Sequence, residues 1–351
     1  MWVEKDGTVI SDEPFWSSEM APGLRGIIFL YTRTSEEEAD MRIAVFGTGG
    51  VGGYFGGRLA QAGEEVVFIA RGAHLNAMRQ KGLRVDSIKG DFVIQPVQAT
   101  DEPRRVGEVD AILVGVKAWQ VPEASLQMQP MLGPQTFVVP LENGVDAPAQ
   151  LAAALGPEHV LGGLCHISAF IAEPGHIQHT GIQPHVAFGE LDGRDSQRAH
   201  RLLAAFQKTN VLAEIPPDIQ VAMWEKFLFI AAFSGVGAVT RAPVGVMRSL
   251  PETRQMLEKA MQEIFAVARA RKIDLREDII ARTLSFFDGM GPNVFASMQR
   301  DLMEGRPSEL GSQNGAVVRM GLESGVPTPL HSFIYHSLLP QELRARGEVA
   351  F

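Results

Sequence analysis

The chain has 351 residues, 45% of them hydrophobic, and a formal net charge of −9, which suggests about two globular domains with a sizeable core. Residues 1–40 contain nine acidic and three basic residues and so carry −6 of that charge. The remainder has no basic stripe, which argues against a nucleic-acid partner. No run approaches the roughly 18 apolar residues of a membrane helix, and the acidic start argues against a signal peptide. We therefore expect a cytoplasmic protein with no membrane partner.

Residues 1–40 differ from the rest of the chain, because turn formers and acidic residues surround one short apolar patch. We expect this N-terminal extension to be largely irregular and assign it no chemistry. Two explanations stay open: a translation start placed too far upstream, and a genuine extension that covers a surface.

A strand, a tight turn and a helix are predicted next. Residues 42–46 are an apolar, β-favouring run, and Gly47, Gly49 and Gly52 follow with the spacing G-x-G-x-x-G before helical periodicity begins. In a dinucleotide site the first glycine allows the turn, the second lets the backbone approach a pyrophosphate, and the third lets the helix pack on the strand. The helix N-terminus would offer N–H groups to the phosphates. The alternative is a glycine-rich packing turn.

The end of the next predicted strand, residues 66–70, distinguishes NAD from NADP. An NAD-binding chain usually has Asp or Glu there to accept the ribose hydroxyls, whereas this chain has Arg71. A guanidinium can pair with a 2′-phosphate, so the sequence favours NADP. The alternative is that Arg71 is a solvated loop charge.

Alternating strands and helices continue to residue 215 and predict an α/β fold with a Rossmann-like, doubly wound sheet over residues 41–215. We expect a helix at 73–81, two short strands within 83–99, a strand at 109–116, a helix at 120–131, a strand at 136–140, a helix at 146–155, strand segments at 160–172, 175–180 and 185–189, a helix at 196–208 and a strand at 211–215. The only cysteine, Cys165, has apolar neighbours and is expected to be a buried strand residue rather than a reactive thiol.

Pro216-Pro217 breaks this pattern, and helical periodicity dominates from there onward. We predict an all-α second domain over residues 216–351, with helices at 218–232, 244–249, 251–271, 277–287, 297–304, 309–323 and 329–343. Its methionines offer apolar surface on which a homodimer could form.

Polar side chains follow two strands of the predicted sheet. Lys117 comes after 109–116, and Asn143 comes after 136–140. Ligands of such sheets lie beyond the carboxyl ends of the strands, so both side chains are candidates to hold a cofactor ribose or a substrate oxygen. The alternatives are a solvated strand-end charge and a simple Asn-Gly turn.

Lys226 is unusual because it lies inside a helix that is otherwise apolar and aromatic. A lysine facing a cleft beside a ketone could donate the proton that a hydride reduction requires. Ile230 and Ser234 follow on the same helix face. The alternative is that Lys226 reaches solvent or pairs with Glu225.

Two further residues have structural explanations by default. Glu309 would lie in the first turn of a helix, where a carboxylate favours the helix dipole, and Ser297 would be an N-cap. We predict no metal site, because His176 and His179 would point to opposite faces of a strand.

These segments together resemble the ketopantoate reductase (2-dehydropantoate 2-reductase) family from residue 41 to about residue 345. The resemblance rests on Gly47-Thr-Gly-Gly-Val-Gly52, Val116-Lys-Ala-Trp-Gln120, Leu141-Glu-Asn-Gly144, Trp224-Glu-Lys226, and Ser308-Glu309 followed by Asn314-Gly315. It implies a 6-phosphogluconate-dehydrogenase-like arrangement of the two domains. It also implies NADPH-dependent reduction of a 2-oxo acid, namely ketopantoate to pantoate in pantothenate biosynthesis.

The same resemblance assigns roles to individual residues. The implied catalytic residues are Lys226, the lysine that gives its proton to the keto oxygen, and Glu309, the acid that binds substrate in the helical domain. Ser297, Asn143 and Ser234 are substrate-binding positions, Ser234 standing in for a family asparagine. The implied cofactor-binding residues are Gly47, Thr48, Gly49, Gly50, Val51, Gly52, Arg71, Lys117, Asn143 and Glu309.

The chain departs from the family one and two turns after Lys226, where Ile230 and Ser234 stand in place of the usual asparagines. A site that loses a hydrogen-bonding group discriminates against the hydroxylated substrate that needed it, which weakens the case for ketopantoate itself. The alternatives are a related reductase acting on another oxo acid or an imine, and a non-catalytic NADP-binding regulator.

Overall fold

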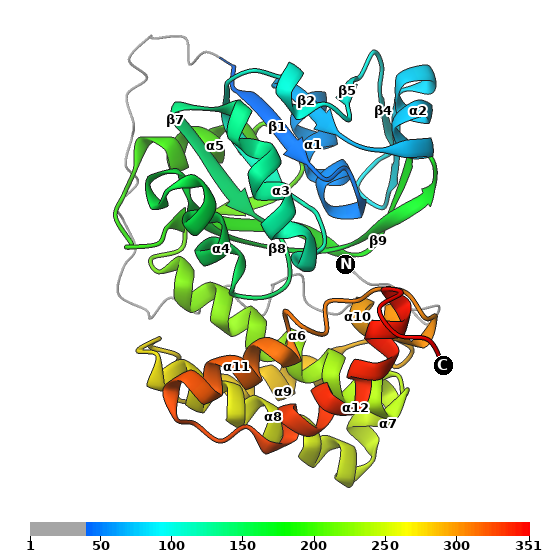
Figure 1. The fold of residues 1–351 in the computed structure, drawn as a ribbon, viewed down its shortest axis with the longest axis vertical. Coiled ribbons are helices and arrows are strands. Elements are labelled where there is room, and N and C mark those ends of the chain that lie inside the picture. Colours follow the sequence, from blue (N-terminus) through cyan, green and yellow to red (C-terminus); the bar gives the residue numbers. More distant parts are fainter. Residues whose placement is uncertain (1–39) are drawn as a thin grey trace. The chain divides into compact units, whose positions relative to one another are not determined.

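The structure is a computed structural model that describes residues 40–351, so the expectations for residues 1–39 lie outside the described part. The described chain has a sheet region, residues 40–214, and a helical region, residues 219–351 (Figure 1). Pro216 and Pro217 lie in the connection between the two.

A five-stranded parallel sheet lies at the centre of the sheet region. Its order is β5-β2-β1-β6-β7. The strands are β1 (Arg42–Phe46), β2 (Glu65–Ile69), β5 (Gln98–Thr100), β6 (Val109–Val114) and β7 (Leu132–Pro140). Their apolar runs fit burial on both faces, as parallel sheets require, and the order confirms the predicted Rossmann-like fold.

Helices cover both faces of this sheet (Figure 1). They are α1 (Gly50–Gln61), α2 (Gly72–Lys81), α3 (Val121–Met128) and α4 (Ala147–Leu155). Val45 of β1 packs in one apolar core with Phe55 of α1, and its neighbour Phe46 packs in another core with Met128 of α3. Successive side chains alternate across a strand, so the single strand β1 contributes to both cores.

The remaining strands form a second sheet in the order β10-β9-β3-β4, with β8 paired to β9. They are β3 (Leu83–Ser87), β4 (Phe92–Ile94), β8 (Leu161–Glu173), β9 (His176–Glu190) and β10 (Leu212–Glu214), and helix α5 (Gln197–Gln207) precedes the last of them. Two expectations are wrong here. Residues 83–99 begin three strands rather than two, the third of which joins the first sheet, and 175–180 and 185–189 belong to one strand. An irregular stretch of β9 between Thr180 and His185 absorbs the turn-forming glycine and proline without ending the strand.

Seven helices make up the helical region of the described chain. They are α6 (Ile219–Thr240), α7 (Val244–Ser249), α8 (Pro251–Ala270), α9 (Ile279–Gly289), α10 (Ser297–Met303), α11 (Asn314–Ser324) and α12 (Pro329–Ala345). Helix α6 is central, because α8, α10, α11 and α12 all pack against it (Figure 1). The helical region therefore confirms the all-α half of the predicted fold.

Helix α6 extends to Thr240, whereas the sequence predicts its end at residue 232. Gly235 and Gly237 suggest a helix stop in the sequence, but packing requires them. A Cβ on Gly235 would lie 2.3 Å from the Nδ2 atom of Asn314, and one on Gly237 would lie 2.6 Å from the Oε1 atom of Gln299. The two glycines thus let polar side chains of neighbouring segments approach the helix closely.

The expectation that no run is long and apolar enough to span a membrane is wrong for α6. Its 22 residues have a mean hydropathy of 1.4 in the most apolar window. However, 67% of that window is buried inside the structure, as in a core helix.

The segment that carries Glu309 differs from its prediction. Helix α11 begins at Asn314; residue 309 is a bend and residues 310–313 form turns instead of a first helical turn. Glu309 accepts backbone hydrogen bonds at its carbonyl from Ser312 and Gln313, at 3.1 and 2.9 Å. Its expected default role as a helix-dipole partner is therefore wrong.

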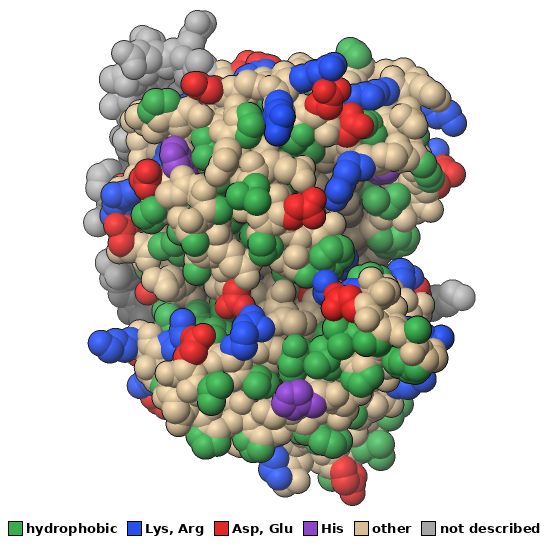
Figure 2. Space-filling model, in the orientation of Figure 1, with side chains coloured by type: hydrophobic (Ala, Val, Ile, Leu, Met, Phe, Trp, Pro, Cys, Tyr) green, Lys and Arg blue, Asp and Glu red, His purple; other side chains and the backbone are tan. Residues whose placement is uncertain are grey.

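Acidic and basic side chains are interspersed on the face of the molecule in Figure 2, and neither sign gathers into one large patch.

Candidate active site

The glycine turn between β1 and α1 has the geometry that the spacing predicts. Gly47 adopts φ +96°, and a Cβ on Gly52 would lie 2.2 Å from the carbonyl oxygen of Gly47. By contrast, a Cβ on Gly49 would meet its nearest atom only at 3.9 Å. The fold itself thus requires Gly47 and Gly52, whereas the space above Gly49 is open to a ligand.

The N-terminus of α1 is free to bind an anion. The helix begins at Gly50, its N-cap Gly49 has no side chain to cap it, and the first turn holds no acidic residue. The N–H groups of Gly50 and Val51 therefore have no side-chain acceptor at this cap. Thr48 is buried instead, and its hydroxyl donates to the Ile69 carbonyl at 3.0 Å.

A hollow lies beside this turn at the ends of β1 and β2. Its lining residues include Gly47, Arg71, Asp101 and Glu123. The Asp101 carboxylate pairs with Arg79 at 3.5 Å, whereas Arg71 is exposed and forms no ion pair within the described chain. Arg71 is therefore available to an anionic ligand in this hollow.

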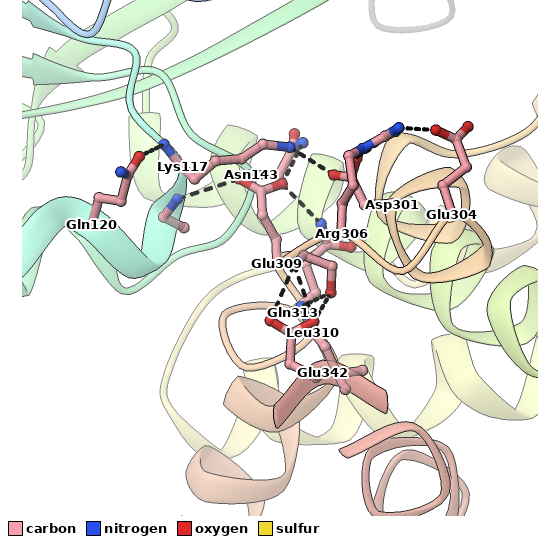
Figure 3. A network of polar contacts seen from close by, with 12 residues as sticks. Lys117, Gln120, Asn143, Asp301, Glu304, Arg306, Glu309, Leu310, Gln313 and Glu342 are labelled. Atoms are coloured by element: carbon pink, nitrogen blue, oxygen red, sulfur yellow. Dashed lines mark hydrogen bonds and ion pairs between the residues drawn. The ribbon is translucent and has the colours of Figure 1, made fainter. Parts of the chain in front are cut away.

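Lys117 connects the two regions of the molecule. Its Nζ atom lies 2.8 Å from Oδ2 of Asp301, on α10 (Figure 3). The other oxygen of Asp301 accepts two hydrogen bonds from Arg306, at 2.9 and 3.1 Å. Asp301 is buried and shared between two cations, a role that the sequence analysis missed because the pair joins residues 184 positions apart.

Glu309 also bridges the two regions. Its Oε2 atom accepts from the side-chain amides of Asn143 and Gln313, at 3.2 and 3.3 Å, and its Oε1 atom accepts from the Ala118 backbone N–H at 3.4 Å (Figure 3). The carboxylate is buried, at 5% exposure. Lys117, Asn143 and Glu309 thus come together, as one site would require.

The loop that carries Glu309 is held from behind by a second carboxylate, Glu342 of α12. The Ser308 backbone N–H donates to both oxygens of Glu342, at 3.1 and 3.0 Å, and the Ser308 hydroxyl donates to one of them at 2.5 Å. Arg346 balances the charge of Glu342 at 2.7 Å. This support fixes where Glu309 can lie.

Ser234 supports the same loop instead of facing an open surface. It is fully buried, and its hydroxyl contacts the Gln313 side-chain oxygen at 2.5 Å and the Ile230 carbonyl oxygen. The side-chain amide of Gln313 in turn donates a hydrogen bond to Glu309. No role for Gln313 was predicted from the sequence. Ile230 is partly buried on the same helix.

Lys226 is partly buried near the middle of α6, and no side chain of the described chain forms a hydrogen bond or ion pair with it. The expected alternative of a pair with Glu225 does not occur. The charge of Lys226 nevertheless affects a residue of β8. Burial holds the pKa of His166 well below its usual range, and Lys226 lowers it further. Burial likewise raises the pKa of the Cys165 thiol to about 11, against the opposing effect of Lys226. Cys165 is a buried strand residue, as predicted.

Glu142 lies directly before Asn143 and was not singled out by its sequence position. It is 8% exposed, and neither of its carboxyl oxygens has a hydrogen-bond partner. Burial and, to a smaller extent, the nearby charge of Glu309 raise its pKa well above the usual range, while the backbone N–H groups of Glu142 and Leu141 and then the charge of Lys226 oppose that shift. A carboxyl group of this kind is a frequent mark of a functional site.

Ser297 is the first residue of α10, one turn before Asp301, and is partly buried. The N-cap of this helix is Ala296, so the expected structural role of Ser297 as an N-cap is wrong. Within residues 40–351, no three His, Cys, Asp or Glu side chains form a group that could hold a metal ion.

Comparison with known families gives two matches. The family described as "Ketopantoate reductase PanE/ApbA" matches residues 43–193, and "Ketopantoate reductase PanE/ApbA C terminal" matches residues 218–342. Together the two matches cover most of the chain.

Three individual proteins illustrate the similarity. The solved structure of 2-dehydropantoate 2-reductase from Geobacter metallireducens is 30% identical, covers 86% of this chain and 99% of its own, and has a TM-score of 0.80. "Uncharacterized oxidoreductase YkpB" of Bacillus subtilis is 28% identical over 298 residues, which is 85% of this chain and 98% of that protein. The ternary structure of D-mandelate dehydrogenase with NADH and anilino(oxo)acetate shares the fold, with a TM-score of 0.79 over 87% of this chain and 99% of that one at 23% identity.

Proposed function

This chain belongs to the ketopantoate reductase family and is an oxidoreductase, and we propose that it reduces the keto group of a 2-oxo acid with hydride from NADPH. The first candidate substrate is 2-dehydropantoate, the keto acid in the names of its relatives. The observation that supports the proposal is Lys226, an ammonium group that no side chain of residues 40–351 bonds or pairs with and whose charge acts on Glu142 and Cys165 of the sheet region.

The residues of the glycine turn suit a dinucleotide. Gly49 leaves open space, and the first N–H groups of α1 have no side-chain acceptor, so both can meet a pyrophosphate. Arg71 would hold the 2′-phosphate that distinguishes NADPH from NADH. When bound, the cofactor supplies the hydride to the keto carbon.

Lys226 would supply the proton. As negative charge develops on the keto oxygen, the Nζ group donates a proton to it and stabilises the charge. Asn143, whose amide is oriented by Glu309, and Ser297 would hold the substrate, and Lys117 would contact the cofactor ribose or the substrate carboxylate. Lys117 and Asn143 follow the carboxyl ends of β6 and β7, and the contacts of Glu309 with Asn143 and Ala118 support assigning the site to this place.

A different 2-oxo acid or an imine is the second candidate substrate. The Ser234 hydroxyl is engaged by Gln313 and by the Ile230 carbonyl, so it cannot replace the amide that a hydroxylated substrate would need. Ile230 offers no hydrogen bond from its side chain at all. These two positions favour a substrate with a more apolar tail than 2-dehydropantoate.

The proposal is tested by following oxidation of NADPH and NADH with 2-dehydropantoate, with linear and branched 2-oxo acids, and with a cyclic imine. The largest kcat/KM with 2-dehydropantoate supports the first candidate, and a larger value with another acid or the imine supports the second. Tight NADPH binding without turnover of any compound would overturn the proposal in favour of a non-catalytic NADP-binding regulator.

A further inference from the structure

The described part of the chain contains one carboxyl group that is buried with both oxygens unpartnered, and it belongs to Glu142. Every other buried carboxylate around the site is engaged: Glu309 accepts from three donors, Asp301 pairs with Lys117 and Arg306, and Glu342 pairs with Ser308 and Arg346. Burying an acid without a hydrogen-bond partner costs folding free energy, so its presence indicates a functional role.

Three titratable groups act on Glu142, each from a different element, and printed contacts bring those elements to it. Glu309 bonds the adjacent Asn143, the Cys165 thiol donates to the Leu141 carbonyl, and Met223, one turn before Lys226 on α6, packs with Leu164 of β8 and Val145. Glu309 comes from the loop before α11, Cys165 from β8 and Lys226 from α6. The cysteine is neutral, because burial raises its pKa to about 11. Lys226 is therefore the only cation in the described chain that acts on Glu142, and no side chain of residues 40–351 bonds or pairs with it. His166 of β8 also feels the charge of Lys226, but burial holds its pKa well below the usual range, so it adds no charge near neutral pH.

We propose that Glu142 is a positioning residue for Lys226: its neutral carboxyl leaves the ammonium group free for the substrate, and its ionised form draws that ammonium into a buried ion pair. The inference rests on the proposed function, because it concerns the proton that Lys226 gives to the keto oxygen. The two side chains come from the sheet region and the helical region, so their pairing would turn Lys226 away from a ligand held between them.

Physical chemistry sets the direction of the effect. Burial and Glu309 keep the carboxyl of Glu142 protonated well above the pH at which an exposed glutamate ionises, because they raise its pKa. Once ionised in a low-dielectric interior, it attracts the nearby ammonium far more strongly than it would in water. Reduction should therefore weaken as the pH rises through the pKa of Glu142.

The test compares the pH profile of kcat/KM for the wild type and for Glu142→Gln, which carries a neutral amide at every pH. Above the pKa of Glu142 the wild type should lose about tenfold per pH unit, and Glu142→Gln should keep its activity to a higher pH. Glu64→Gln is the matched control, because Glu64 is buried just before β2 begins, at the opposite end of the parallel strands from Glu142, and bonds Lys208. It should retain the wild-type alkaline limb.

A second readout needs no turnover. A carboxyl whose pKa is raised in the folded state binds its proton more tightly there than in the unfolded chain, so it destabilises the fold as the pH rises above about 4.3, the ordinary glutamate value. Glu142→Gln should therefore gain thermal stability over the wild type progressively from that pH upward. The gain should be larger in a Lys226→Met background, which removes the cation that stabilises ionised Glu142.

The outcomes separate this inference from the proposed function. If the alkaline limb of the Glu142→Gln profile is the same as in the wild type, the inference is overturned while the reductase assignment stands. If Glu142→Gln does not fold, Glu142→Leu takes its place in this comparison. A stability gain that does not depend on Lys226 overturns it as well. The predicted stability pattern in a protein that turns over no oxo acid or imine supports the pairing and refutes the proposed reductase function.

Discussion

The cofactor end of this site, around Gly47–Gly52 and Arg71, and its catalytic end, around Lys117, Asn143 and Glu309, use different chemical groups. At the cofactor end, the turn at Gly47 and the start of α1 present backbone N–H groups and open space, and Arg71 forms no ion pair with any other residue of 40–351. At the catalytic end, side chains from both regions are already bonded to one another, as in the pairs of Lys117 with Asp301 and Asn143 with Glu309 (Figure 3).

This difference shows what each end depends on. The cofactor end depends on glycines that a few neighbouring residues specify, so its variants should change binding and little else. The catalytic end depends on contacts between distant segments, so its variants should affect both turnover and the cohesion of the two regions.

Lys226→Ala should have the largest effect. Loss of the proton donor should lower kcat by about 10²- to 10⁴-fold, while the Kd for NADPH, measured by fluorescence titration, stays near the wild-type value. Lys259→Ala, at an exposed position of α8, is the control and should behave as wild type. Equal turnover in the two variants would contradict the role of Lys226.

Glu309→Gln should affect both properties of the catalytic end. The amide group would face donors from Asn143 and Gln313, so we expect kcat/KM to fall by about 10- to 100-fold and unfolding free energy to fall by about 1–3 kcal/mol. Steady-state kinetics and thermal melts measure the two effects. The exposed Glu348→Gln is the control, and a loss of activity without any loss of stability would argue that Glu309 does not hold the regions together.

Gly49→Ala and Gly52→Ala should separate ligand binding from folding at the cofactor end. A Cβ at Gly49 enters open space, so this variant should keep its melting temperature and lose about tenfold in NADPH affinity. A Cβ at Gly52 would collide with the carbonyl oxygen of Gly47 in the turn, so the Gly52→Ala variant should have both a lower melting temperature and a lower NADPH affinity. Similar melting temperatures for the two variants would show that the turn tolerates a side chain where the structure leaves no room.

Arg71→Gln should have the smallest effect. Because Arg71 is exposed, solvent screens its charge, and the loss of NADPH affinity should be about fivefold, or about 1 kcal/mol. Affinity for NADH should not change, and the exposed Arg104→Gln should alter neither. A parallel loss for both cofactors would mean that Arg71 does not meet the 2′-phosphate.

The sequence predicts the fold well where local signals are sufficient. The glycine spacing, the apolar runs of the parallel strands and the helical periodicity after Pro216-Pro217 all correspond to elements of the structure. The errors occur where a tertiary contact overrides a local signal. Gly235 and Gly237 allow close helix packing instead of ending α6. Strand β9 continues through Gly181 and Pro184 because β8 pairs with it both before and after this stretch.

The same limit applies to the site. Lys117 and Asn143 can be selected from the sequence because each follows a predicted strand of the sheet, and Lys226 because it lies in an otherwise apolar helix. Asp301 and Gln313 cannot, because their importance lies in partners far along the chain. Glu142 precedes a selected asparagine, but only its burial without a partner distinguishes it.

The bonds that join the two regions have a consequence for ligand entry. A ligand that binds Lys117 must break its bond to Asp301, and a ligand that binds Asn143 must break its bond to Glu309. Binding therefore exchanges one hydrogen-bond partner for another instead of filling an empty space. Because the Lys117 side chain is 43% exposed, dissolved ions weaken its existing bond. Added salt should therefore loosen the resting arrangement before any substrate arrives, and the measured affinity will combine the release of the old partner with the capture of the new one.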